Sequence, residues 1–206
     1  MLKIWGRISS INVRKVVLAA QWLGIAFERI DAGHEFGITR TPEYLAMNPN
    51  ALVPTIEDGA LRLWESNVIV RYLCAKHSMG DLYPRELEPR FDAERWMDWQ
   101  QTTLNPAGRN AFVQLMRTPA ERRSNDLVAQ SIAATEPLLR MLDDHLSRTP
   151  FMSGTAFGMA DIPIACEIHR WRGLPIAQVA LSHVDRWYDG VRSHAAARGV
   201  LDVSLS

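Results

Sequence analysis

The run from Asn48 to Leu73 constrains the fold more than any other part of the chain. Asp58-Gly59 separates two short apolar pieces, and because both residues tolerate positive φ, this pair predicts a tight β-hairpin. The apolar residues that follow Glu65-Ser66 recur at helical spacing, which predicts an amphipathic helix. The expected order is therefore proline, strand, turn, strand, polar pair and helix.

Two parts of this run can also serve a ligand. Glu65 and Ser66 fall at the first turn of the expected helix, where unpaired backbone N–H groups and the helix dipole attract a carboxylate or phosphate. Pro54 opens a strand, and a cis Val53–Pro54 bond would leave the backbone of Val53 available to a peptide-like ligand. Taken alone, each part is explained more simply as an ordinary helix cap or an ordinary strand-opening proline.

The rest of the chain divides into a mixed first half and a helical second half. Strands at 2–5 and 26–30 flank a helix with an apolar stripe, which predicts a parallel βαβ unit, and a short helix is expected at 42–47. The predicted fold class is α/β plus all-α, with an N-terminal domain of order β-α-β-α-β-β-α at 1–78, a linker at 79–87 and an all-helical domain at 88–206. Its helices are expected at 86–116, interrupted near Pro106 and Gly108, and at 119–146, 160–171 and 176–194.

The Val53-Pro54 and Glu65-Ser66 pairs, in this order and at this spacing, resemble the cytosolic glutathione transferases. In that family a thioredoxin-like domain carries a cis proline after Val or Ile, a Glu-Ser or Gln-Ser starts the next helix, and an all-helical domain follows. The resemblance covers nearly the whole chain and is closest to bacterial, serine-type or theta-like members. One departure is Gly158, where the family usually has the Ser or Thr of a capping box with Asp161.

The resemblance implies that the turn before the first helix activates the thiol of glutathione. A free thiol of pKa about 8.5 is mostly protonated at neutral pH, so a hydroxyl or amide donor beside a helix N-terminus is needed to favour the thiolate. Counting back from Val16 in the family pattern indicates Ser10 as this donor. Ser9 is the neighbour that a one-residue shift would indicate, and Asn12 matches a position where some bacterial members use an asparagine. The alternative is that all three side chains only cap the helix.

The resemblance also implies which residues bind the rest of glutathione, the expected co-substrate. Val53, followed by Pro54, is expected to bind the cysteinyl unit through its backbone. Glu65 and Ser66 are expected to bind the γ-glutamyl amine and carboxylate, and Asn67 to lie near the same end. For the glycyl carboxylate, the Asp31–Asn50 loop offers Arg40 and Asn50, and less favourably His34; each is otherwise an ordinary solvated residue.

A pocket for a small hydrophobic electrophile is expected between the domains, lined by the turn at Arg7–Ser10 and the helix at 86–116. Trp99, Thr103 and Arg109 are candidates for its wall, although aromatic residues at helical spacing usually belong to a core. The predicted function is conjugation of glutathione to such electrophiles by a homodimer. Two alternatives stay open: glutathione-dependent disulfide reduction, suggested by Asn12, and a member that binds ligands or proteins without catalysis.

Charge and composition limit the classes of partner that the chain is expected to bind. The chain has 23 basic and 23 acidic residues, so its formal net charge of zero argues against nucleic acid or an anionic membrane as the main partner. No apolar run approaches the roughly 18 residues that span a bilayer, and the N-terminus lacks a signal-peptide core, which predicts a cytoplasmic protein. Cys74 and Cys166 are expected to be buried structural thiols, and the histidines form no metal-ligand pattern.

Overall fold

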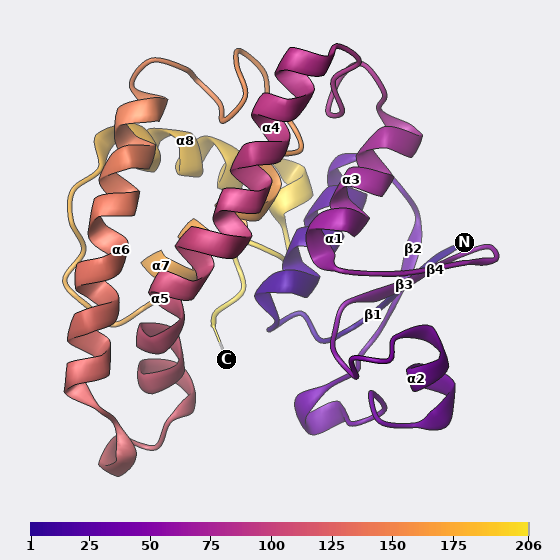
Figure 1. Ribbon diagram of the computed structural model, residues 1–206, viewed down its shortest axis with the longest axis horizontal. Helices are drawn as coiled ribbons and strands as arrows, with labels where there is room; N and C mark the ends of the chain where they lie inside the picture. The colour runs from indigo at the N-terminus through magenta and orange to yellow at the C-terminus, as the bar shows by residue number, and fades with distance from the viewer. Residues whose placement is uncertain (206) are drawn as a thin grey trace.

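The computed structural model describes residues 1–205 and divides into a sheet-containing half and a helical half. Figure 1 shows the sheet on the right and the helical half on the left. The four-stranded sheet has the order β2-β1-β3-β4; β1 pairs in parallel with β2 and antiparallel with β3, and β4 pairs antiparallel with β3. The predicted thioredoxin-like fold class is confirmed. Its elements are β1 (Leu2–Trp5), α1 (Ile11–Trp22), β2 (Phe27–Ile30), α2 (Pro42–Met47), β3 (Thr55–Asp58), β4 (Leu61–Trp64) and α3 (Ser66–His77).

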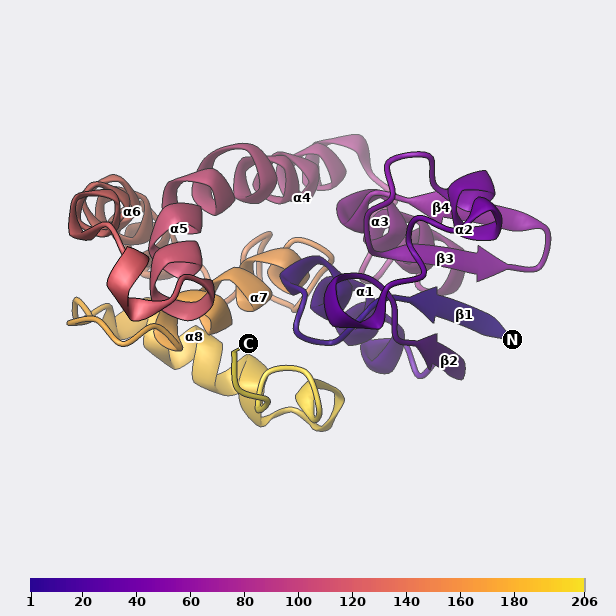
Figure 2. The same ribbon diagram turned by 90° about the horizontal axis from the view of Figure 1, so that it is seen from below.

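Two helices join the sheet to the helical half. In Figures 1 and 2, α1 and α3 lie between the sheet and the helices that follow. Helix α1 packs against α3 on one side and α7 (Asp161–Arg172) on the other, and α7 is buried along almost its whole length. The helical half also contains α4 (Leu87–Trp99), α5 (Asn105–Phe112), α6 (Asn125–Leu146) and α8 (Ser182–Ser193). The predicted domain limits of 1–78 and 88–206 stay a prediction.

The helix expected at 86–116 is interrupted by two π-helical turns, η2 (Gln100–Leu104) and η3 (Val113–Arg117). Pro106 has no N–H to donate to the carbonyl four residues earlier, and the turn before it widens. Gly108, also expected to disturb the helix, lies within regular α5. A β-carbon there would lie 3.4 Å from the ring of Trp171, so this glycine permits close packing on α7.

Two predicted helix starts are wrong, and both true starts have a capping side chain. Helix α6 begins at Asn125 and not at Pro119, because the hydroxyl of Ser124 accepts the N–H of Leu127. Helix α8 begins at Ser182 and not near residue 176. Its first N–H groups donate to the carboxylate of Asp143 on α6, a cap that comes from another element and leaves no local sequence signal.

The structure also bears on partners of other kinds. Within residues 1–205, no helix is long and apolar enough to cross a membrane. The same residues contain no group of three or more metal-ligating side chains that could hold an ion. Cys74 and Cys166 are both fully buried, as predicted, and burial raises the pKa of each thiol to about 12, so neither is a thiolate at neutral pH.

Candidate active site

A cavity of about 400 Å³ lies where the turn before α1 meets α5 and η3. It brings together Ser9, Ser10 and Asn12 from the start of α1 with Val53 from the loop before β3. Its other walls come from α5, η3, α7 and the C-terminal segment. Residues separated by more than 40 positions in the sequence thus share one cavity, as the predicted sulfur site requires.

Ser10 is the N-cap of α1, yet its hydroxyl does not cap the helix. Its backbone is extended, with φ −79° and ψ 123°, and the side chain forms no capping hydrogen bond. The residue is only 9% exposed and lines the cavity. The capping explanation therefore does not account for this hydroxyl, which remains available to a ligand at the positive end of the α1 dipole.

The two neighbours of Ser10 also reach the cavity. Ser9 is partly buried in its wall. The Oδ1 atom of Asn12 is buried and has no hydrogen-bond partner within residues 1–205. A buried acceptor without a partner costs about 1–3 kcal/mol, which a bound ligand with an N–H donor would offset.

The loop before β3 presents Val53 to the same cavity. The Val53–Pro54 bond is cis, as the family resemblance implies. Within the described chain, no hydrogen bond uses the backbone N–H or C=O of Val53. The preceding carbonyl, that of Leu52, accepts hydrogen bonds from the Tyr44 hydroxyl at 2.7 Å and the Asn48 side chain at 2.9 Å, which fixes the loop.

Glu65 and Ser66 stand at the start of α3, outside the lining of this cavity. Glu65 is exposed and has φ 72°, a left-handed conformation that disfavours residues with a β-carbon by about 1–2 kcal/mol. Ser66 is the first helical residue and is only 4% exposed. Asn67 points elsewhere: its Nδ2 donates to the carbonyl of Met97 at 2.7 Å and so ties α3 to α4.

The loop residues expected near the glycyl carboxylate do not line the cavity. Arg40, Asn50 and His34 are all exposed. Asn50 donates to the side chain of Asn48, and His34 pairs with Glu35 at 2.9 Å. None of the three is held toward Val53 by a hydrogen bond in the described chain.

On the opposite wall, one of three predicted residues faces the cavity. Arg109 of α5 lines it, whereas Trp99 and Thr103 do not. Trp99 instead packs edge-on against Trp96, with ring centroids 5.3 Å apart, which is the core role that its spacing also allowed.

Four other arginines line this cavity: Arg7, Arg14, Arg117 and Arg170, from the turn before α1, α1 itself, η3 and α7. The turn that contains Arg7 was expected in the lining, whereas the other three arginines were missed. Arg117 stands eight positions after Arg109, a spacing that returns to one side of a helix, so this pair could have been recognised. The others come from separate elements and carry no shared local pattern.

Buried Arg14 holds the C-terminal segment beside the cavity. Its guanidinium donates to the carbonyls of Val203 and Ser204, at 3.1 Å and 3.0 Å, and lies 3.0 Å from the ring of His169. His169 also contacts the Tyr188 hydroxyl at 2.8 Å. Burial, and then the charge of Arg14, lowers the pKa of His169 to about 4, so this ring is neutral at pH 7.

This depressed pKa makes folding stability depend on pH. Between about pH 6.5 and 4 the unfolded chain binds a proton at His169 that the folded chain does not, so stability falls as the pH falls. From pH 7 to pH 5, wild type should lose about 2 kcal/mol more than a His169→Gln variant. Urea unfolding at both pH values measures this difference, and equal losses in the two proteins would contradict the assignment.

The chain is similar to known proteins in both sequence and structure. Residues 1–75 match the family model described as glutathione S-transferase, N-terminal domain. Glutathione S-transferase GstB of Escherichia coli K12 is 38% identical over 208 residues, which cover 100% of both chains. A solved theta class glutathione S-transferase from Xanthomonas axonopodis pv. citri, with glutathione bound, is 40% identical, covers 100% of this chain and 99% of its own, and superposes with a TM-score of 0.96.

Proposed function

This chain belongs to the glutathione S-transferase family and is an enzyme of that family, and we propose that it conjugates reduced glutathione to a small electrophile. In this proposal, the start of α1 holds the thiol of glutathione as a thiolate. One observation carries it: Ser10 is only 9% exposed in the cavity wall, and its hydroxyl does not cap its helix.

The chemistry follows from the position of this hydroxyl. A donor to the sulfur, together with the N-terminal end of the α1 dipole, lowers the pKa of the bound thiol. The thiolate then attacks the electrophilic carbon, a sulfur–carbon bond forms, and the leaving group departs with its electron pair. Binding both reactants in one cavity removes much of the entropic barrier to their encounter.

The rest of glutathione would extend from Val53 toward α3. The unpaired backbone of Val53 would bind the cysteinyl unit, Glu65 the ammonium group, and Ser66 with the first turn of α3 the γ-glutamyl carboxylate. Arg40 or Asn50 would bind the glycyl carboxylate from the exposed loop. We propose that the protein acts as a homodimer in the cytoplasm.

Calorimetric titration with glutathione tests this function first. We expect saturable binding at micromolar to millimolar concentration, and no binding at millimolar concentration would overturn the proposal. Turnover of an aryl halide, compared with that of a glutathione mixed disulfide, then separates conjugation from disulfide reduction. Binding without either activity would indicate a non-catalytic member.

Glu65→Gln should weaken glutathione binding about tenfold, because a charge-assisted hydrogen bond to the ammonium group is replaced by a neutral one. Glutaryl-cysteinylglycine, which lacks only the α-amino group, is the matched control ligand. Wild type and Glu65→Gln should bind this analogue equally. Equal affinities of the two proteins for glutathione itself would remove Glu65 from the site.

A further inference from the structure

Three arginine side chains on the cavity wall have no hydrogen-bonding or ion-pairing partner among the described residues. Arg7, Arg109 and Arg117 come from the turn before α1, from α5 and from η3. Within residues 1–205, their guanidinium groups form no side-chain hydrogen bond or ion pair. Arg14 and Arg170 line the same cavity but are bonded internally, Arg14 to backbone carbonyls and Arg170 to Glu167 and Asn105.

The charge at this wall is positive although the whole chain is neutral. Among the described residues, none that lines the cavity is acidic. Arg117 is exposed, but partial desolvation lowers its pKa, and the positive charges of Arg7, Arg170 and Arg109 lower it further. The two other titratable groups in the lining, His169 and Cys166, are neutral at pH 7 because of their shifted pKa values.

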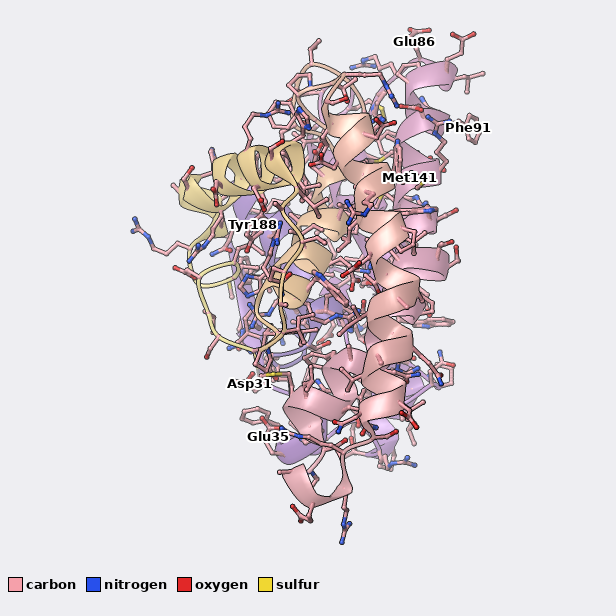
Figure 3. The ribbon with its side chains drawn as sticks, turned by 90° about the vertical axis from the view of Figure 1, so that its left-hand side faces the viewer. Asp31, Glu35, Glu86, Phe91, Met141 and Tyr188 are labelled. Carbon is pink, nitrogen blue, oxygen red and sulfur yellow. The ribbon has the colours of Figure 1, made fainter. Side chains whose placement is uncertain are left out.

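One acidic side chain outside the cavity interacts electrostatically with the arginine cluster, which consists of Arg7, Arg109 and Arg117. Glu35, labelled in Figure 3 and located on the 3₁₀ turn η1 (His34–Phe36), raises the pKa of Arg117, but by less than the arginines lower it. Glu35 is exposed and already paired with His34. The arginine cluster therefore keeps an uncompensated positive charge that an anion in the cavity would offset.

The same wall also has an apolar surface. Phe112 and Val113 line the cavity between Arg109 and Arg117. The guanidinium of Arg117 lies over the ring of Phe112, 4.8 Å from its centroid. A ligand that suits this wall has an apolar body and an anionic group, since either feature alone would leave part of the wall unmatched.

We propose that the electrophile conjugated here carries a carboxylate or a similar anionic group, bound by Arg109 and Arg117 on the wall opposite Ser10. This inference rests on the proposed transferase function and differs from the uncharged hydrophobic electrophile expected from the family resemblance. The anionic group does not react. The thiolate forms the sulfur–carbon bond, and the leaving group on that carbon departs with its electron pair. The arginines also offset the repulsion between the thiolate and an anionic reactant.

A matched pair of substrates, 4-chloro-3-nitrobenzoate and 4-chloro-3-nitrobenzamide, tests the proposal. For each substrate, kcat/KM is divided by the rate constant of its uncatalysed reaction with glutathione. In wild type this normalised value should be at least about tenfold higher for the benzoate than for the benzamide. In the double variant Arg109→Gln, Arg117→Gln the ratio of the two normalised values should fall to near one. The control variant Arg95→Gln, Arg148→Gln removes the same charge at exposed positions and should keep the wild-type ratio.

A binding measurement without turnover distinguishes failure of the anionic site from failure of the proposed transferase function. With S-methylglutathione filling the thiol site, 3-nitrobenzoate should bind wild type more tightly than 3-nitrobenzamide does. Equal or reversed preference would overturn the anionic acceptor site while leaving conjugation intact. If the double variant instead lost affinity for glutathione with the substrate ratio unchanged, the arginines would bind the tripeptide and the inference would also be wrong. Absence of glutathione binding in wild type would overturn the proposed function itself.

Discussion

Asp161→Ala is expected to destabilise the folded protein by about 3–5 kcal/mol, the largest effect of a single substitution that we predict. The carboxylate is fully buried and accepts hydrogen bonds from the backbone N–H groups of Met152 and Gly158 and from the indole N–H of Trp187, at 3.0, 2.9 and 2.8 Å. Alanine would leave all three donors buried without a partner. Urea unfolding at about pH 7.5 measures the loss, since burial raises the Asp161 pKa only to about 6.

Asp143→Ala is the matched control for this prediction. Asp143 caps α8 through the N–H groups of His183 and Val184 but is less buried than Asp161. Loss of such a cap costs about 1–2 kcal/mol. A destabilisation by Asp161→Ala no larger than that of Asp143→Ala would show that the buried hydrogen bonds of Asp161 are not the main stabilising element there.

Ser10→Ala is expected to raise the pKa of the bound glutathione thiol by about 1–2 units, because one hydrogen bond to the thiolate is lost. At about pH 6.5, where little thiolate then remains, kcat/KM should fall about 10- to 100-fold. The dissociation constant of glutathione should change little, since its other contacts remain. Ultraviolet titration of the thiolate and steady-state kinetics measure the two quantities.

Ser9→Ala and Asn12→Ala provide the comparison, because both side chains line the same cavity. If Ser10 is the sulfur donor, neither variant should shift the thiol pKa as far as Ser10→Ala. An unchanged pKa in Ser10→Ala, with a shift in one of the others, would transfer the role to that residue.

The fold was predictable where local pattern determines structure. The hairpin at Asp58-Gly59 and the helix starting after Ser10 both depend on residues close in sequence. The cis Val53–Pro54 bond was implied by the family resemblance. The start of α8 was not predictable in this way, because its cap is Asp143, some 40 positions away. The sequence retains only the Asp161 half of the capping box, and this half is formed: the N–H of Gly158 donates to the Asp161 carboxylate.

The candidate site was predictable to a similar extent. Ser9, Ser10, Asn12 and Val53 were identified from motifs, and the structure brings them into one cavity. Asn67 could not be assigned from its position beside Ser66, because its side chain bonds the backbone of α4. Arg109 was predicted for the cavity wall, and its spacing could also have indicated Arg117. Arg14 and Arg170 were missed, because only tertiary packing brings α1 and α7 to the same cavity.

A crystal structure with reduced glutathione bound tests the central proposal most directly, namely that the start of α1 holds the sulfur. The account predicts the sulfur within hydrogen-bond distance of the Ser10 hydroxyl, about 3–3.5 Å, with the cysteinyl backbone paired to Val53. A sulfur out of reach of every side-chain donor in residues 9–12 would contradict it.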